Sequence, residues 1–259
     1  MITVGIVGMG VIGTEIAKAI SNGIPGIALS GVSVRRAATA GAYPVFPLDE
    51  LIRRSDLIVE AATQSALRQF GADVLRAGRH LMVLSVGALV DTLAEWSRLA
   101  EQHGCRILVP SGAIAGLDGV KGAREGAITA LTMETRKPPR GLAGAPHIEQ
   151  QRIDLDAIRE QTLIFEGPAT EAVRGFPANV NVVAALSLAG IGPERTRIRI
   201  YAVPGLLRNQ HRVTVEGEFG RLRMEIENVP SENPRTGRLS YLSAIAMLRE
   251  LGSPLRAGT

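Results

Sequence analysis

The sequence predicts an α/β protein, in which a parallel sheet with helices on both faces is followed by a second α/β domain with a mixed, largely antiparallel sheet. Three observations predict this fold. The chain opens with an aliphatic strand that leads into closely spaced glycines and then a helix. Up to about residue 110, aliphatic strands alternate with segments of helical periodicity, as in parallel sheets. Beyond that point, the expected strands alternate apolar and polar residues, as in half-buried antiparallel sheets.

The composition agrees with a folded chain of this class. Of the 259 residues, 46% are hydrophobic and 21% are charged, which is the profile of a globular protein. Aromatic residues make up only 3%, so the core depends on aliphatic side chains. The net charge of +4 comes from arginines spread along the chain, without a dense basic run. This distribution disfavours nucleic-acid binding and suits a small anionic ligand, although a solvated surface explains it equally well.

Cysteine usage and the apolar segments narrow the class of protein further. Cys105 is the only cysteine, which excludes intramolecular disulfides and fits a reducing compartment such as the cytoplasm. Glycines and Glu15 interrupt the apolar N-terminus, so a signal peptide is not expected, and no apolar run is long enough to span a membrane. Histidines and carboxylates show no metal-ligand spacing. We therefore expect a cytoplasmic protein with no metal site and no membrane partner.

The N-terminal elements follow one another in regular order. A strand is expected at 2–7, and the next helix has Ile12, Ile16, Ala19 and Ile20 at helical spacing. Further strands are expected at 27–34, 56–62, 80–86 and 105–110, and further helices at 48–54, 65–77 and 90–103.

The C-terminal half changes character. A strand at 127–139 leads into a loop rich in Gly, Pro and Ala (138–147), and a later helix is expected to start at Pro177 and to end at Gly190. Segment 196–203 and a hairpin over 211–229, which turns near 217–220, are expected to be antiparallel strands. The last helix, 233–251, has Asn233 as its N-cap and Pro234 in its first turn. Because such a helix often packs back on the first sheet, we expect one domain from 1–110 plus 232–259 and another from 111–231.

The glycine-rich turn after the first strand has the pattern G-x-G-x-x-G at Gly8, Gly10 and Gly13. The first glycine allows a tight turn, the second lets the backbone approach a pyrophosphate, and the third lets helix and strand pack closely. The strand before it and the helix after it are the context that this pattern requires. We expect a Rossmann-type, doubly wound dinucleotide-binding domain in which Val11 and Ile12 also contact the cofactor. The alternative is a structural glycine turn.

The second strand determines which dinucleotide is expected. An acidic residue at its end would bind the ribose 2′-hydroxyl of NAD, but this strand ends in Arg35 and Arg36. Arginine at this position can pair with a 2′-phosphate. The sequence therefore mildly favours NADP over NAD, unless both arginines are simply solvated.

Two later features suggest where a substrate would bind. The segment 109–120 is rich in small residues and follows the last parallel strand, so it should border the nicotinamide, unless it is an ordinary crossover between domains. His211 follows the loop at Pro204–Gly205 and comes just before an expected strand, so it could point into a cleft between the domains. Of the other histidines, His80 begins a strand, whereas His103 and His147 are expected at surface or loop positions.

A set of segments along the whole chain occurs together in one order: GIVGMGVIG (5–13), PSGAIAGLDG (110–119), TRKPP (135–139), FPANVNVVAALSLAGIGP (176–193), RNQH (208–211), GEFG (217–220) and NPRTGRLSYLSAIAMLRE (233–250). With these segments the chain resembles the L-aspartate dehydrogenase family. The resemblance implies a Rossmann domain followed by an open-sheet substrate and dimerisation domain, in a homodimer. It also implies NAD(P)-dependent, reversible oxidative deamination of L-aspartate to oxaloacetate and ammonia through iminosuccinate, which can feed NAD biosynthesis.

The same resemblance assigns roles to individual residues. His211 matches the catalytic histidine of the family. The nicotinamide-binding alanine falls on Ala115 or Ala113, and the cofactor-binding asparagine falls on Asn181 in preference to Asn179. The two carboxylates of the substrate need cationic or N–H partners, for which the candidates are Asn209, Arg208, Lys137 and Ser111 with the backbone of Gly112.

One departure from the family leaves the substrate open. The family usually carries Asp-Pro ahead of the asparagine and histidine, whereas this chain has Val203-Pro204. One alternative is therefore an NAD(P)-dependent dehydrogenase or reductase of a different small amino or imino acid. A reductase of a cyclic imine would be expected to carry a histidine- and lysine-rich signature that is missing here. The other alternative is a non-catalytic NAD(P)-binding sensor, against which Asn209 and His211 argue.

Overall fold

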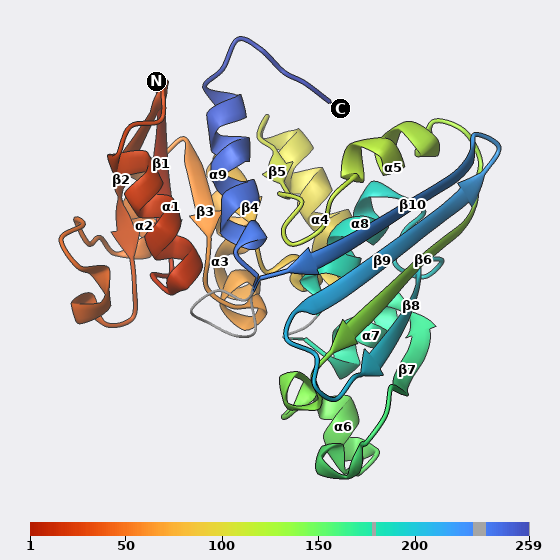
Figure 1. Ribbon diagram of the computed structural model, residues 1–259. Helices are drawn as coiled ribbons and strands as arrows, with labels where there is room; N and C mark the ends of the chain where they lie inside the picture. The colour runs from red at the N-terminus through yellow and green to blue at the C-terminus, as the bar shows by residue number, and fades with distance from the viewer. Residues whose placement is uncertain (178–179, 230–236, 259) are drawn as a thin grey trace. The chain divides into compact units, whose positions relative to one another are not determined.

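A computed structural model describes residues 1–177, 180–229 and 237–258 (Figure 1). The chain divides into two compact units. The first comprises Met1–Gly112 with Ser240–Ala257, and the second comprises mainly Ala113–Leu239. No helix of the described residues is long and apolar enough to cross a membrane.

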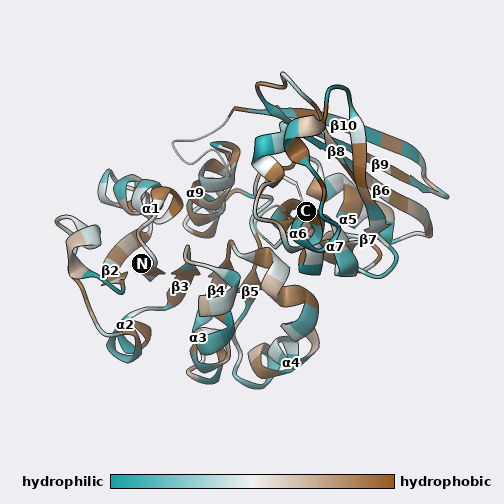
Figure 2. Cartoon of the chain, turned by 90° about the horizontal axis from the view of Figure 1, so that it is seen from below, coloured by the Kyte–Doolittle hydropathy of each residue, from teal (hydrophilic) through white to brown (hydrophobic). Residues whose placement is uncertain are grey.

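The first unit contains a parallel sheet with the strand order β2-β1-β3-β4-β5. The strands are β1 (Ile2–Val7), β2 (Ile27–Ser33), β3 (Leu57–Glu60), β4 (His80–Val83) and β5 (Ile107–Leu108). The helices are α1 (Val11–Ser21), α2 (Leu48–Arg54), α3 (Gln64–Arg76), α4 (Leu89–Gln102) and α9 (Leu239–Leu251). Helices α1 and α9 lie on one face of the sheet, and α2, α3 and α4 lie on the other (Figure 2). The predicted Rossmann-type fold is confirmed.

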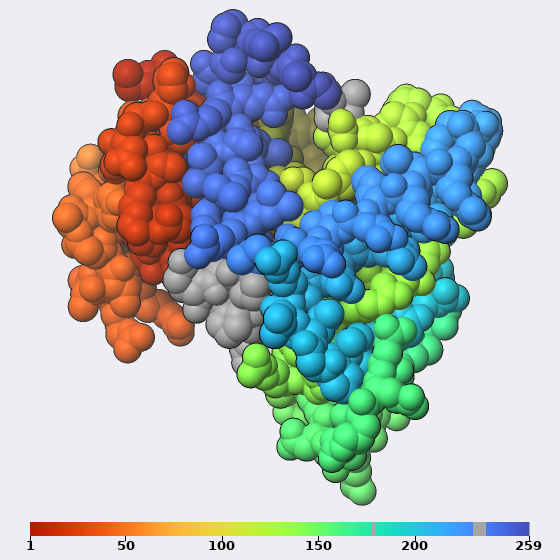
Figure 3. All heavy atoms as spheres, viewed as in Figure 1, coloured from red at the N-terminus to blue at the C-terminus, as the bar shows by residue number. Residues whose placement is uncertain are grey.

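Helix α9 packs beside α1 on the sheet (Figure 3). Ala244 and Leu248 of α9 share one core cluster with Ile16 of α1 and with Val4 and Ile6 of β1, all of them buried. The C-terminal helix therefore completes the core of the first unit. It begins at Leu239, later than the sequence predicts, and the expected cap at Asn233 and Pro234 lies outside the described residues.

The second unit contains a sheet with the strand order β10-β9-β6-β8-β7. Its strands are β6 (Ile128–Lys137), β7 (Thr162–Pro168), β8 (Arg197–Ala202), β9 (Asn209–Gly217) and β10 (Gly220–Asn228). The β9–β10 hairpin turns where the sequence predicts. Only β6 and β8 pair in parallel, so the expected mixed, largely antiparallel sheet is confirmed. The expectation that 196–203 is simply antiparallel is wrong, because β8 lies parallel to β6 on one side and antiparallel to β7 on the other.

The sequence does not predict several short elements of this unit: α5 (Leu117–Arg124), α6 (Pro146–Gln150), β7 and α7 (Ala169–Gly175). Helices of eight residues or fewer give little periodic signal and form mainly through tertiary packing. Strand β7 lies at the edge of the sheet and ends in Gly167–Pro168, residues that weaken a strand pattern. The remaining turns are 3₁₀ segments at Ala37–Ala40, Val86–Ala88, Pro139–Leu142 and Leu155–Ala157.

Two further sequence expectations in this region are wrong. Helix α8 (Asn181–Ala189) ends at Gly190 as predicted, but it begins four residues after Pro177, which lies in a turn. His147 is not a free surface residue, because it lies half-buried in α6 with Nε2 3.2 Å from the carbonyl oxygen of Ile164. Its ring packs against Phe165 and the fully buried Phe176. Phe176 has a non-helical backbone, because the ring of the following Pro177 disfavours the helical conformation of the residue before it.

Candidate active site

The glycine turn at the end of β1 has the geometry that a dinucleotide requires. Gly8 has a φ of +95°, and a Cβ atom there would lie 2.7 Å from the carbonyl oxygen of Ala61. A Cβ atom on Gly13 would overlap the carbonyl oxygen of Gly8. By contrast, a Cβ atom on Gly10 would meet nothing within 4 Å, so a ligand can approach the backbone there. The first and third glycines are therefore required by packing, and the second opens towards a ligand.

The N-terminus of α1 can hold an anion. Gly10 is the N-cap of this helix, and no side chain caps it. Val11 and Ile12 form the start of the first turn, in which backbone N–H groups have no partner within the helix. These N–H groups and the helix dipole favour a pyrophosphate. The residues present therefore fit a bound NAD or NADP.

Arg35 and Arg36 lie at the expected position beyond the end of β2. Both are exposed, and neither forms an ion pair with another residue of the described ranges. Their charges are thus available to a phosphate group. The assignment of this position to the 2′-phosphate of NADP remains a prediction.

The segment that joins the two units contains several predicted site residues. Ser111 and Gly112 belong to the first unit, where the N–H of Gly112 donates to Oγ of Ser243 at 3.0 Å. Ala113 begins the second unit and is buried, and its carbonyl oxygen accepts a bond of 2.9 Å from Nδ2 of Asn228. Ala115 is exposed. Of the two alanines, Ala115 is therefore the one whose side chain a ligand can reach.

The second sheet changes from apolar to polar along its buried face. On β6, the buried side chains alternate with exposed or half-buried ones, and they run from Leu131 and Met133 to Thr135 and Lys137. Thr135 lies opposite His211 of β9 in the antiparallel register. The hydroxyl oxygen of Thr135 is 3.1 Å from Nδ1 of His211. The polar end of this apolar layer therefore brings a hydroxyl, an imidazole and an ammonium group to one region.

His211 lies inside a strand, not just before one as the sequence analysis expects. Strand β9 begins at Asn209, because its backbone pairs with β10 as far as Asn228. The side chain of His211 is only 5% exposed, as is that of Lys137. This strand position fixes the backbone of the histidine between two neighbouring strands.

Burial sets the charge states of these two groups. Burial, together with the positive charge of Lys137, lowers the pKa of His211 to about 3. Burial lowers the pKa of Lys137 to about 8. At pH 7 the imidazole is therefore neutral and the lysine still largely protonated. A neutral imidazole that donates from Nδ1–H to Thr135 leaves Nε2 as a proton acceptor.

The other predicted site residues differ in how far they are exposed to solvent. Asn209 is half-buried and lies two residues before His211, on the same face of β9. Arg208 is exposed, and its guanidinium group is 4.0 Å from the carboxylate of Glu227. Asn181 is the first residue of α8 and is half-buried, whereas Asn179 lies outside the described residues.

Val203, where the family usually carries an acidic residue, lies directly beside the candidate site. Its N–H donates to the carbonyl oxygen of Lys137 at 2.8 Å. The departure therefore lies beside the backbone of Lys137 and not at a remote position. Thr135 and Asn228 are absent from the sequence-based site. The alternation of β6 places Thr135 on the face of Lys137, but the contact of Asn228 with Ala113 joins residues 115 positions apart.

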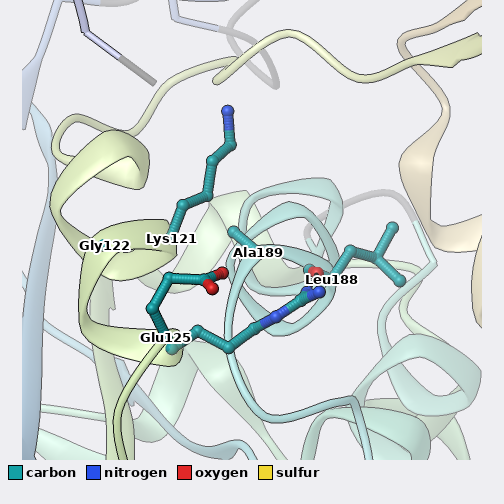
Figure 4. A pocket seen from close by; sticks show the side chains of 6 residues that line it. Lys121, Gly122, Glu125, Leu188 and Ala189 are labelled. Atoms are coloured by element: carbon teal, nitrogen blue, oxygen red, sulfur yellow. Dashed lines mark hydrogen bonds between the residues drawn. The ribbon is translucent and has the colours of Figure 1, made fainter.

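One surface pocket of the second unit lies apart from this site, and a second, smaller one reaches His211. Figure 4 shows one of about 500 Å³. Its lining comes from α5 and α8 and includes no predicted site residue: Lys121, Gly122, Arg124, Glu125, Leu188 and Ala189. A smaller pocket of about 110 Å³ is lined by His211 together with residues of β6, β9 and β10: Arg136, Gln210, Arg212, Glu225, Ile226 and Glu227. The neighbours of His211 along β9, Gln210 and Arg212, lie on the outer face of the sheet. That outer face carries ion pairs such as those of Glu134 with Arg136 and Arg212.

We predict that Lys137→Met raises the pKa of His211, because the substitution removes a nearby positive charge and retains the burial. The pKa should stay below the ordinary value of 6.5. An NMR titration of the labelled imidazole measures the shift, with Lys121→Met on the exposed face of α5 as the control. An unchanged pKa of His211 in Lys137→Met would contradict the coupling between the two charges.

In the wild type, we predict that His211 makes the free energy of unfolding fall as the pH drops from 6.5 towards 3. In this range only the unfolded chain takes up the proton on this histidine.

Both units match the family models of known dehydrogenases. The family model described as "Aspartate dehydrogenase, C-terminal" matches residues 118–251. The model described as "Homoserine dehydrogenase, NAD binding domain" matches residues 8–110. The chain is 46% identical to L-aspartate dehydrogenase of Methanosarcina barkeri over 275 residues, and 48% identical to that of Methanocella arvoryzae over 270 residues. Each alignment covers 100% of both proteins.

A solved structure gives the same result. The crystal structure of aspartate dehydrogenase from Thermotoga maritima matches with a TM-score of 0.81 at 25% identity, and the match covers 100% of each chain. The resemblance expected from the ordered segments is thereby confirmed, and the chain belongs to the L-aspartate dehydrogenase family.

Proposed function

We propose that this protein catalyses the reversible, NAD(P)-dependent oxidative deamination of L-aspartate to oxaloacetate and ammonia through iminosuccinate. One observation carries the proposal above the others. A neutral, buried His211 is hydrogen-bonded to Thr135 at the polar end of the second sheet, where Lys137 supplies a buried positive charge. Membership of the L-aspartate dehydrogenase family supports the same reaction.

The cofactor is proposed to bind at the glycine turn, where Gly8, Gly10 and Gly13 with Val11 and Ile12 would hold the pyrophosphate. Ala115 and Asn181 are the proposed contacts of the nicotinamide, and Ala113 would support the loop through its bond to Asn228. When bound, NAD(P) supplies the acceptor for a hydride from the α-carbon of the substrate. The chain itself must then manage the imine.

His211 is proposed to be the general base. With Nδ1–H donating to Thr135, Nε2 takes a proton from the water that adds to the imine carbon of iminosuccinate. A C–O bond forms and gives a carbinolamine. The imidazolium then returns its proton to the nitrogen. As the C–N bond breaks, the freed Nε2 takes the proton of the hydroxyl group, so that ammonia leaves and oxaloacetate remains, and solvent finally takes this proton from the imidazolium. Burial keeps the histidine unprotonated at pH 7 at the start of each cycle. Because the charge of Lys137 lowers the pKa of His211, an anion bound beside Lys137 would raise the basicity of Nε2.

Lys137 is proposed to bind a carboxylate of the substrate. Desolvation on burial disfavours the charged form of this ammonium group and lowers its pKa to about 8. A substrate carboxylate offsets that cost and is fixed beside His211. Asn209, Ser111 and the more exposed Arg208 are the proposed additional partners. Val203 favours the second candidate function, which is dehydrogenation of a different small amino or imino acid by the same chemistry.

We further propose that the protein works in the cytoplasm as a homodimer. The buried, free thiol of Cys105 is compatible with a reducing compartment. The homodimer rests on the resemblance to the family.

The proposed reaction is tested by reductive amination. We expect rapid oxidation of NADPH or NADH, followed at 340 nm, with oxaloacetate and ammonia, and much slower oxidation with other 2-oxo acids. An ammonia-free control separates this activity from direct reduction of oxaloacetate. Turnover with a different 2-oxo acid alone would replace aspartate as the substrate. Cofactor binding without turnover on any acid would refute the enzymatic function.

We predict that His211→Ala lowers turnover by a factor on the order of 100 or more and leaves cofactor affinity nearly unchanged. The reason is that the base for water addition is lost, whereas the glycine turn is intact. The matched control is His103→Ala, which alters an exposed histidine at the end of α4. Near wild-type turnover in His211→Ala would remove this residue from the mechanism.

We predict that Arg35→Asp combined with Arg36→Ala weakens NADP binding much more than NAD binding. Both exposed guanidinium groups are proposed partners of the 2′-phosphate, which only NADP carries. Fluorescence titration with NADPH and NADH gives the two dissociation constants. If both constants rise equally, the arginines do not read the 2′-phosphate.

A further inference from the structure

Glu60 is a fully buried carboxylate at the carboxyl end of the first sheet. It is the last residue of β3 and 0% exposed. In the strand register it lies between Val7 of β1 and Val83 of β4. Strand β2 lies on one side of β1, and β3 and the later strands lie on the other. The topological switch point is therefore between β1 and β3, where Glu60 lies. In doubly wound sheets, ligands bind outside the strand ends at this point.

The carboxylate accepts hydrogen bonds from two separate turns. Oε1 accepts from the N–H of Ala62 at 2.9 Å and from Oγ of Ser85 at 2.8 Å. Oε2 accepts from the N–H of Ser85 at 2.8 Å and from that of Leu84 at 3.2 Å. Three of the four donors are backbone groups in the turns that follow β3 and β4. One side chain therefore fixes both turns.

The same contacts reach the glycine turn. A Cβ atom on Gly8 would lie 2.7 Å from the carbonyl oxygen of Ala61 and 3.0 Å from Cα of Ala62. The N–H of Ala61 in turn donates to the carbonyl oxygen of Val7. The backbone that Glu60 holds at Ala62 is thus the backbone against which the Gly8 turn packs. The turns after β1, β3 and β4 form one connected edge.

The chemistry at this position requires a carboxylate. Burial raises the pKa of Glu60, and the four hydrogen bonds oppose that shift. An apolar side chain would leave three backbone N–H groups without their acceptor, and a glutamine would direct an N–H₂ group at some of the same donors. A buried charge is a costly way to fill a core position. All four donors belong to the turns at the carboxyl end of the sheet, where ligands bind in doubly wound folds. A function in ligand binding would explain why a buried charge is kept at this position.

We propose that Glu60 is a positioning residue for the dinucleotide, which holds the turns after β3 and β4 against the glycine turn in the arrangement that binds NAD(P). This inference rests on the NAD(P)-binding part of the proposed function and not on the identity of the amino acid substrate. Glu60 acts through the backbone of Ala62, Leu84 and Ser85.

The test is cofactor affinity measured without substrate. We expect Glu60→Gln to raise the dissociation constants of NADH and NADPH by a factor on the order of ten, and by the same factor for both, because the 2′-phosphate is not involved. Ser85→Ala removes one of the four donors and should weaken both cofactors by a smaller factor, about threefold. The matched control Glu95→Gln changes an exposed glutamate of α4 and should leave both constants unchanged. Fluorescence titration gives the constants, and circular dichroism gives Tm.

A purely structural role predicts a different pattern. If Glu60→Gln lowers Tm but binds both cofactors as the wild type does at a temperature well below Tm, the proposal is wrong. If Glu60→Gln does not fold, Ser85→Ala decides, since it retains the three backbone bonds; unchanged cofactor affinity in that variant overturns the proposal. Failure of the proposed reaction is distinguishable, because it would appear as a wild-type protein that binds NADH and turns over no 2-oxo acid.

Discussion

The register between β6 and β9 is the constraint on which the candidate active site depends. Thr135 and His211 meet only because they are opposite one another, and a slip of one residue would turn the histidine to the outer face. The apolar residues further along the same face hold this register, because Met133 and Val213 are buried in it. The apolar core of the second unit thus determines where the polar groups stand, and a hydrophobic pattern specifies the geometry of the candidate site.

The first unit follows a related principle at the carboxyl edge of its sheet. Strands β1, β3 and β4 are aliphatic through their buried lengths, and the last position of β3 carries the charged Glu60. Two constraints act on the same edge of the sheet. Close packing excludes side chains at Gly8 and Gly13. Hydrogen bonds to Glu60 fix the backbone of the neighbouring turns. In both units, polar chemistry lies where an apolar layer ends, so that burial supplies both the rigidity and the altered pKa values.

Features that depend on neighbouring residues were predictable from the sequence, and those that depend on distant contacts were not. The strand, glycine turn and helix at the N-terminus and the hairpin at 217–220 are local patterns. The bond between Thr135 and His211 joins residues 76 positions apart, and the donors to Glu60 at Ser85 lie 25 positions away. Glu60 is the last residue of the run LIVE, and nothing in that pattern distinguished a residue that holds neighbouring turns from an ordinary strand end. His211 was singled out by its position between the Pro204–Gly205 loop and an expected strand, and the family resemblance gave it the catalytic role.

The charge balance around Lys137 gives a physical reason for selecting anionic substrates. Lys137 is 5% exposed, and burial lowers the pKa of its ammonium group to about 8. At position 203 this chain has an aliphatic residue, whose backbone N–H donates to the carbonyl oxygen of Lys137. In the role proposed for Lys137, a carboxylate bound beside this buried ammonium group favours its charged form, so that anionic substrates are preferred to neutral ones. The same argument makes substrate binding raise the pKa of Lys137, which couples occupancy of the site to the charge that His211 experiences.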